Sequence, residues 1–226
     1  MIELYHVVKR YPHAERPALD GLNLRIEKGE FCLLTGPSGA GKTTLLRLLF
    51  CADLATRGQV MIQSRNVAQL PRRQIPYLRR NLGVIFQDFK LLHRQSVLEN
   101  VALALEVQGR SPQEIQERAE RILREVGLAH SLYERADHLS GGEQQRVAVA
   151  RALVTDPTIV LADEPTGNLD PDRAKDIMDL LVRANTRGAT VLVATHDPML
   201  LEAYKTRVLV LDEGRLVQDS RGEKPR

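Results

Sequence analysis

Residues 36–43 read Gly-Pro-Ser-Gly-Ala-Gly-Lys-Thr, a stretch that fits the pattern G-x-x-x-x-G-K-[ST]. An apolar run from Phe31 to Thr35 precedes this loop and predicts a buried strand. Leucines at helical spacing follow it between Lys42 and Cys51 and predict a helix. Such a loop lets successive backbone N–H groups point at a phosphate group, next to the positive end of the helix. The stretch therefore predicts an α/β fold that binds a phosphate-bearing ligand.

The side chains of this loop have separate expected roles. Lys42 is expected to reach the β- and γ-phosphates of a nucleotide, and the Thr43 hydroxyl to bind Mg²⁺. We expect Gly36, Ser38, Gly39, Gly41, Lys42, Thr43 and Thr44 to contact the nucleotide, which the family resemblance described below implies is ATP.

The rest of the chain repeats strand and helix patterns. Ile2 to Val8 and Leu19 to Ile26 alternate apolar and polar residues, which predicts half-buried antiparallel strands. Later apolar runs, separated by helical patterns, predict a parallel sheet; they are Val84 to Phe86, Ile159 to Ala162, Val191 to Thr195 and Val208 to Leu211.

Strand-like runs are missing between Phe89 and Asp156, where Ile115, Ala119, Ile122, Leu123 and Val126 share one helical face. We therefore expect one domain over residues 1–226, with a core at about 1–88 and 156–219 and a helical insertion at about 89–155. The charged tail from Ser220 to Arg226 is expected to fray.

The composition of the 226 residues excludes some classes of function. Aromatic residues are 4% with no Trp, which leaves little material for stacking bases, so we expect no nucleic-acid partner. Cys32 and Cys51 lie in apolar surroundings without metal-ligand spacing and are expected to be buried thiols. No apolar run approaches the ~20 residues of a membrane-spanning helix, so membrane association would need a partner or the surface. Arg72, Arg73, Arg79 and Arg80 form a basic patch that either faces anionic lipid or is simply solvated.

Two carboxylates end the apolar run of residues 159–162, namely Asp163 and Glu164. Ligands of α/β folds bind at the carboxyl ends of the strands, and neighbouring residues of a strand point opposite ways. We expect Asp163 to face Mg²⁺ and Glu164 to act as the base that polarises the attacking water. Taken alone, the pair also fits a solvated strand end before the turn at Pro165.

Residues 139–146 read Leu-Ser-Gly-Gly-Glu-Gln-Gln-Arg. Ser140 and Glu143 fit a capping box, which by itself would explain the segment without any ligand. The same residues make a second anion cradle, because Ser140, Gly141 and Gly142 crown a helix that continues to Leu153. Together with the loop at 36–43 and the carboxylate pair, this octet resembles the signature sequence of the ABC ATPases.

Other positions match the ABC pattern one by one. The resemblance implies that Tyr11 stacks on adenine, that Gln87 contacts Mg²⁺ and water, and that His196 contacts the γ-phosphate. It also implies that Asn168-Leu169-Asp170 contacts a second subunit, and that Ser140, Gly141, Gly142 and Asp170 reach the ATP of that subunit. Without this context, packing, solvation or helix capping would explain each residue singly.

The resemblance implies a homodimer that closes on two ATP molecules. Within the family, Ile75-Pro-Tyr-Leu-Arg-Arg80 and Gln87-Asp88 resemble the ATPases of bacterial cell division, which act with an FtsX-like integral membrane protein and possibly with division-ring proteins. This implies a peripheral protein on the cytoplasmic face of the cell membrane. The ATPases of lipoprotein-releasing and MacB-type export systems share residues 162–170 and remain alternatives, as does an ATP-binding tether of the division ring.

Overall fold

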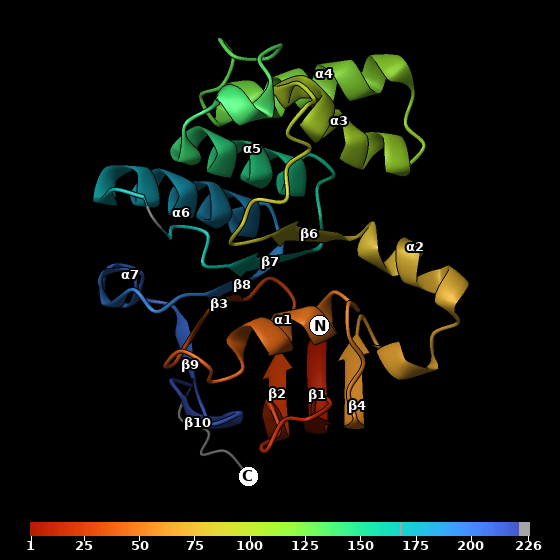
Figure 1. Cartoon of the computed structure of the whole chain (residues 1–226), viewed down its shortest axis with the longest axis vertical. Coiled ribbons are helices and arrows are strands. Elements are labelled where there is room, and N and C mark those ends of the chain that lie inside the picture. The colour runs from red at the N-terminus through yellow and green to blue at the C-terminus, as the bar shows by residue number, and fades with distance from the viewer. Residues whose placement is uncertain (168, 222–226) are drawn as a thin grey trace.

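Two sheets and a layer of helices make up the computed structural model, which describes residues 1–167 and 169–221 (Figure 1). The smaller sheet is antiparallel, in the order β2-β1-β4-β5, and the first two of its strands were predicted from their alternating pattern. Its strands are β1 (Ile2–Lys9), β2 (Leu19–Ile26), β4 (Arg57–Ile62) and β5 (Arg65–Asn66).

The larger sheet has the order β10-β9-β3-β8-β7-β6, and all of its neighbouring strands pair in parallel except β10 with β9. The five apolar runs predicted as strands of a parallel sheet all lie here. The strands are β3 (Phe31–Thr35), β6 (Leu82–Ile85), β7 (Ile159–Asp163), β8 (Thr190–Ala194), β9 (Arg207–Asp212) and β10 (Arg215–Asp219).

Helices cover both faces of the larger sheet. Figure 1 shows α1 between the two sheets and α6 and α5 beyond the other face of the larger sheet, with α3 and α4 farther out beside α5. The α-helices are α1 (Lys42–Leu49), α2 (Ile75–Arg79), α3 (Val97–Val107), α4 (Pro112–Glu125), α5 (Gly141–Leu153), α6 (Pro171–Thr186) and α7 (Pro198–Ala203). Short 3-10 turns cover Val67–Gln69, Arg72–Gln74 and Ala136–His138.

Burial on both faces explains why the central strands are continuously apolar. In β3, Leu33 packs with the helices of the insertion, whereas Cys32 and Leu34 point to the opposite face and pack with α1 and the antiparallel sheet. Cys32 and Cys51 are both buried free thiols, as expected, and burial raises the pKa of Cys32 to about 12.

The helical layer follows the predicted pattern. Ala119, Ile122, Leu123 and Val126 are buried, and Ile115 packs against the same core. The carboxyl-terminal end of α5 also reaches the larger sheet, since a Cβ added at Gly83 would lie 2.5 Å from the carbonyl oxygen of Ala152. Because α5 belongs to the insertion and also packs on the core sheet, the limits of the helical insertion at 89 and 155 stay a prediction.

No helix among the described residues is long and apolar enough to cross a bilayer.

Candidate nucleotide site

The loop between β3 and α1 has a backbone that only glycine can supply at two positions. Gly36 has φ 142°, and a Cβ there would lie 2.0 Å from the carbonyl oxygen of Leu211. Gly41 has φ 105°, and a Cβ there would lie 2.4 Å from the carbonyl oxygen of Ala18. The loop is thus pressed against two other segments, which fixes its curvature.

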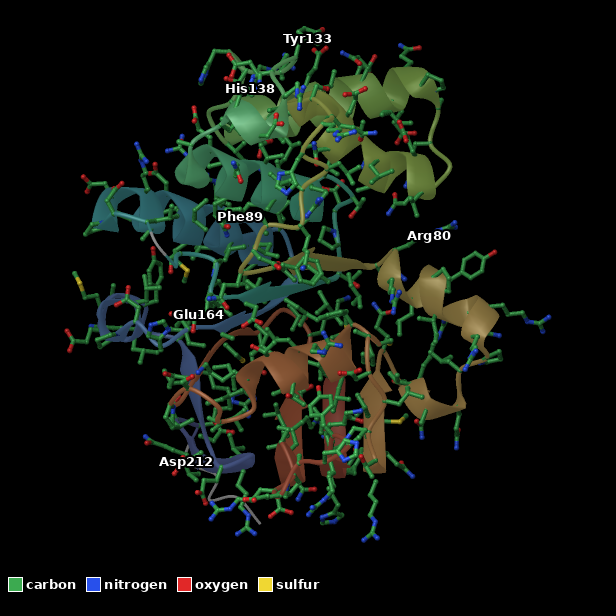
Figure 2. The ribbon with its side chains drawn as sticks, in the orientation of Figure 1. Arg80, Phe89, Tyr133, His138, Glu164 and Asp212 are labelled. Carbon is green, nitrogen blue, oxygen red and sulfur yellow. The ribbon has the colours of Figure 1, made fainter. Side chains whose placement is uncertain are left out.

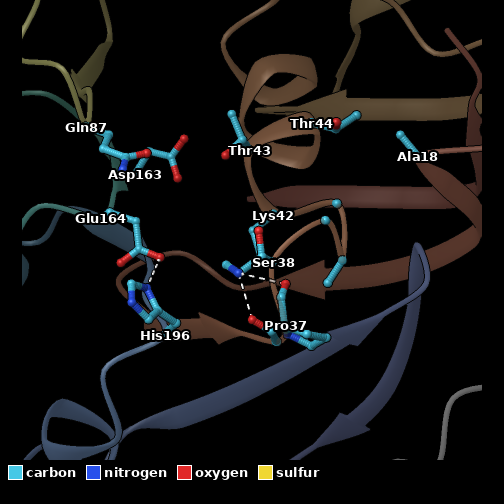
Figure 3. A pocket seen from close by; sticks show the side chains of 14 residues that line it. Ala18, Pro37, Ser38, Lys42, Thr43, Thr44, Gln87, Asp163, Glu164 and His196 are labelled. Carbon is cyan, nitrogen blue, oxygen red and sulfur yellow. Dashed lines mark hydrogen bonds and ion pairs between the residues drawn. The ribbon is translucent and has the colours of Figure 1, made fainter. Parts of the chain in front are cut away.

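Lys42 folds back over this loop. Its ammonium group donates hydrogen bonds to the carbonyl oxygens of Gly36, at 2.7 Å, and Pro37, at 3.2 Å (Figure 3). Only 9% of the residue is exposed. A buried cation is therefore held in the cavity by two neutral carbonyl groups, and a phosphate oxygen would be a stronger partner for it.

Asp163 and Glu164 are directed into the cavity by different means. Asp163 is the last residue of β7, whereas Glu164 lies beyond the strand with φ 48°. The Glu164 N–H donates to the carbonyl oxygen of Ala194, at 2.9 Å. The strand alternation that we expected to separate the two side chains does not apply, because the left-handed backbone at Glu164 ends the strand. Both side chains line one cavity instead.

Glu164 is paired with His196, which follows β8. His196 Nδ1 lies 2.7 Å from Glu164 Oε1, and the two residues come from loops at the carboxyl ends of neighbouring strands (Figure 3). The Glu164 side chain is 12% exposed and the His196 side chain 74% exposed. The histidine is thus the accessible partner of a nearly buried carboxylate.

Thr43, Gln87 and Asp163 lie together at the other end of the cavity (Figure 3). Burial raises the pKa of Asp163, and a hydrogen bond with the Thr43 hydroxyl opposes that rise. One carboxylate, one hydroxyl and one amide oxygen are the hard oxygen ligands that suit Mg²⁺, which keeps several waters and bridges to phosphate. The residues present therefore fit a magnesium ion beside a nucleotide.

The cavity has a volume of about 560 Å³ and gathers eleven of the predicted residues. Pro37, Ala40 and Ala18 also line it. Pro37 and Ala40 lie inside the quoted motif, but no sequence signal marked Ala18, which precedes β2. The predicted residues in the lining are Gly36, Ser38, Gly39, Gly41, Lys42, Thr43, Thr44, Gln87, Asp163, Glu164 and His196.

Tyr11 does not line this cavity. Its hydroxyl donates to Asp53 Oδ2 at 2.8 Å, and the ammonium group of Lys9 lies 4.9 Å from the centre of its ring. Stacking of Tyr11 on adenine therefore stays a prediction.

Ser140 and Glu143 form the capping box that the sequence left open, at the start of α5. The Ser140 hydroxyl donates to Glu143 Oε2 at 2.6 Å, and this bond helps to hold the pKa of Glu143 below its ordinary value. A second cavity of about 240 Å³ lies here, lined by Ser140, Gly142, Glu143, Arg146 and Arg173. It shares no lining residue with the first cavity.

Asp170 caps α6, because its Oδ1 accepts a hydrogen bond from the Arg173 N–H at 3.0 Å. Its Oδ2 lies 3.2 Å from Arg173 Nε. The structure thus ties Asp170 to a residue of the second cavity, and its contact with another subunit stays a prediction. Asn168 and the tail at 222–226 lie outside the described residues.

Residues 19–167 match the family model described as "ABC transporter". The chain belongs to this ABC family. Similar proteins named "Cell division ATP-binding protein FtsE" are 51% identical in Mycobacterium tuberculosis, 46% in Bacillus subtilis and 43% in Escherichia coli. These alignments cover 97%, 99% and 96% of this chain and 95%, 98% and 97% of the relatives.

Solved ABC structures have the same fold over the whole chain. The dimeric structure of a bacterial ABC transporter cassette has a TM-score of 0.91 at 39% identity, and the match covers 100% of this chain and 99% of that chain. A dimeric ATP-binding cassette in a post-hydrolysis state, bound to ADP and Pi, has a TM-score of 0.91 at 38% identity, with the same coverage. The chain is thus an ABC-type P-loop ATP hydrolase that binds ATP, similar along its length to the FtsE proteins.

Proposed function

We propose that this chain is the ATP-hydrolysing subunit of a cell-division complex on the cytoplasmic face of the membrane. Two copies close on Mg-ATP and pass the motion to an FtsX-like membrane protein that activates peptidoglycan hydrolases. Support for the cell-division role comes from relatives named FtsE, which align over nearly their full length in several bacteria.

The proposal of a homodimer rests on one observation, namely that the two expected anion-binding sites of one chain lie apart from each other. The loop with Lys42 and the helix start at Ser140 line different cavities with no residue in common. Free N–H groups at a helix start can bind an anion, and the start of α5 at Ser140 borders a cavity of its own. Closure of two copies would place the Ser140 start of one against the triphosphate held by the Lys42 loop of the other. The dimeric arrangement of similar cassettes supports this reading.

Within the cavity, each residue has a separate task. Lys42 would exchange its carbonyl partners for phosphate oxygens, which neutralises the triphosphate. Thr43, Gln87 and Asp163 would hold Mg²⁺, and this ion supplies charge neutralisation on the phosphate oxygens when bound. Glu164 would act as the general base that accepts a proton from the attacking water, and His196 would orient its carboxylate.

The loop that follows Gln87 connects the cavity to the helical layer. Arg151 of α5 holds this loop against the helix by donating hydrogen bonds to the carbonyl oxygens of Phe89, at 2.6 Å, and Lys90, at 2.7 Å. The helix that carries Arg151 is the one that Ser140 caps. A displacement of Gln87 would therefore shift α5, the helix that would contact the partner's ATP. It would also shift the surface on which a membrane protein would dock.

The test is purification from membranes. Glu164→Gln, with wild type as control, should co-purify with an FtsX-like protein in the presence of Mg-ATP and should fail to support division. Recovery with a lipoprotein-releasing or exporter membrane protein instead would assign the chain to those systems. Normal division with a variant that binds but does not hydrolyse ATP would indicate a tether.

A further inference from the structure

An unusual distribution of charge surrounds α2. Between Asp53 and Asp88 the sequence contains six arginines and no acidic residue or lysine. The whole chain carries a formal net charge of only +3, so acidic residues outnumber basic ones elsewhere. The arginines are Arg57, Arg65, Arg72, Arg73, Arg79 and Arg80.

Four of these arginines lie in the turn before α2, at its last residue and at the residue after it, namely Arg72, Arg73, Arg79 and Arg80, and we call this the α2 surface. Figure 1 shows α2 at the right rim of the molecule, and Figure 2 shows Arg80 at the end of this helix, where its carbonyl oxygen accepts a hydrogen bond from Gln108, at the end of α3. Within residues 1–167 and 169–221, none of the four forms an ion pair with a carboxylate. The positive charge of this surface is therefore not neutralised by the fold.

The fold fixes α2 in place without using its outer charges. Arg79 donates to the carbonyl oxygens of Phe50, at 3.0 Å, and Cys51, at 2.9 Å, and Leu78 is 1% exposed in the core. Arg72 and Arg73 are exposed. Arg79 and Leu78 thus anchor the helix, and Arg72 and Arg73 are left to solvent.

Tyr77 adds an aromatic group to this surface. It is 61% exposed, and the guanidinium carbon of Arg80 lies 4.9 Å from the centre of its ring. Amphipathic aromatic rings next to arginines are typical of surfaces at the level of lipid headgroups, where the ring contacts the acyl boundary and the cations contact phosphate.

We propose that the α2 surface binds directly to a bilayer that carries anionic lipid headgroups. A membrane suits it better than a protein because the charge is of one sign, lies on an exposed rim and carries an exposed aromatic ring. The cell-division role is not required, since the contact involves lipid alone and neither ATP nor a second subunit.

The experiment measures binding of the full chain, without a membrane partner, to vesicles of phosphatidylcholine with and without 30% phosphatidylglycerol. Each arginine near an anionic surface contributes roughly fivefold to partitioning, so Arg72→Gln with Arg73→Gln should lower binding about 30-fold. The matched control is Arg121→Gln with Arg183→Gln, which removes two exposed arginines elsewhere and should bind as wild type. ATP turnover of all variants should be unchanged.

Binding should also weaken at 0.5 M salt, because the contact is exposed and screened. Equal binding to neutral and anionic vesicles, or equal loss in both double variants, would overturn the proposal. Unchanged vesicle binding by the Arg72 and Arg73 variant, with loss of its membrane-protein partner, would assign the surface to protein docking and also overturn it.

Discussion

His196 holds Glu164 through a hydrogen bond of 2.7 Å between Nδ1 and Oε1, and it joins the loops after two neighbouring strands. The carboxylate is nearly buried and the imidazole is exposed, so the imidazole is the member of the pair that is more accessible from the cavity. This pairing fixes the orientation of the group that we assign as the base.

We predict that His196→Ala lowers kcat for ATP hydrolysis by about 10²- to 10⁴-fold, because Glu164 loses the partner that orients it. Affinity for ATP should change only a few-fold, since Lys42 and the loop glycines remain. Phosphate release and titration with a fluorescent ATP analogue measure the two quantities. His196→Gln keeps a hydrogen-bond donor and should recover part of the rate. A kcat for the alanine variant within twofold of wild type would remove His196 from this role.

Ser140 has a matched control in the same chain, because Ser96 and Glu99 form an identical capping box at the start of α3. We predict that Ser140→Ala and Ser96→Ala each lower the free energy of unfolding by about 1 kcal/mol through loss of the cap. Only Ser140→Ala should also abolish ATP turnover, since only this helix start is expected to reach ATP of a second copy. Denaturant titration and turnover assays separate the two effects. Equal turnover in both variants would reduce Ser140 to a helix cap.

Gly36→Ala is expected to prevent ATP binding, because the added Cβ would lie 2.0 Å from the carbonyl oxygen of Leu211 and would displace the loop. Gly188→Ala is the control, since Gly188 has φ 104° but open space around its Cβ position. The control should lose about 1 kcal/mol of stability from backbone strain and bind ATP normally. Isothermal titration calorimetry checks both, and normal binding by Gly36→Ala would contradict the assigned loop geometry.

Asp219 forms a nearly buried ion pair with Arg207, with 2.9 Å between Arg207 Nε and Asp219 Oδ1. The hydrogen bond with Arg207 holds the pKa of Asp219 below its ordinary value. A lowered folded-state pKa contributes stability that is fully present above the unfolded-state pKa of about 4, and this stability is lost as the pH falls from there through the lower pKa of the folded state. Asp219→Asn should therefore cost about 3 kcal/mol at pH 7 and progressively less at pH 3 and below.

Denaturant unfolding at several pH values measures this effect. Asp212→Asn serves as the control, because Asp212 is an exposed carboxylate on the neighbouring strand and should change stability little at any pH. A loss for Asp219→Asn that stays constant from pH 7 to pH 2 would contradict the assigned cause.

Much of the fold follows from local sequence patterns. The central strands are apolar because both of their faces are buried. The apolar and polar residues alternate in residues 2–8 and 19–26 because only one face of the smaller sheet packs against the core. β4, β5, β10 and α2 were not predicted. The first half of β4 is exposed, β5 has two residues, β10 is a mostly exposed edge strand, and α2 has five residues, so none carries a clear periodic signal.

The site residues were predictable where a sequence motif fixes their chemistry. They were less predictable where tertiary structure determines which residues line the cavity and how their side chains are directed. The motif at 36–43 marked the cradle, whereas Ala18 enters the cavity only because β2 lies against Gly41. The direction of Glu164 depends on its left-handed backbone, which strand alternation cannot anticipate. The proposed second role of the Ser140 helix would involve another copy of the chain, so one subunit shows only the helix cap.

The central claim is that ATP is held between two copies of the chain, and it is tested most directly by the mass of a trapped complex. Glu164→Gln with saturating Mg-ATP should elute as a dimer in size-exclusion chromatography with light scattering. The same variant with a second change, Ser140→Arg, should remain monomeric, because the helix start would be blocked. A monomer for Glu164→Gln under saturating Mg-ATP, both alone and with its membrane partner, would contradict the account.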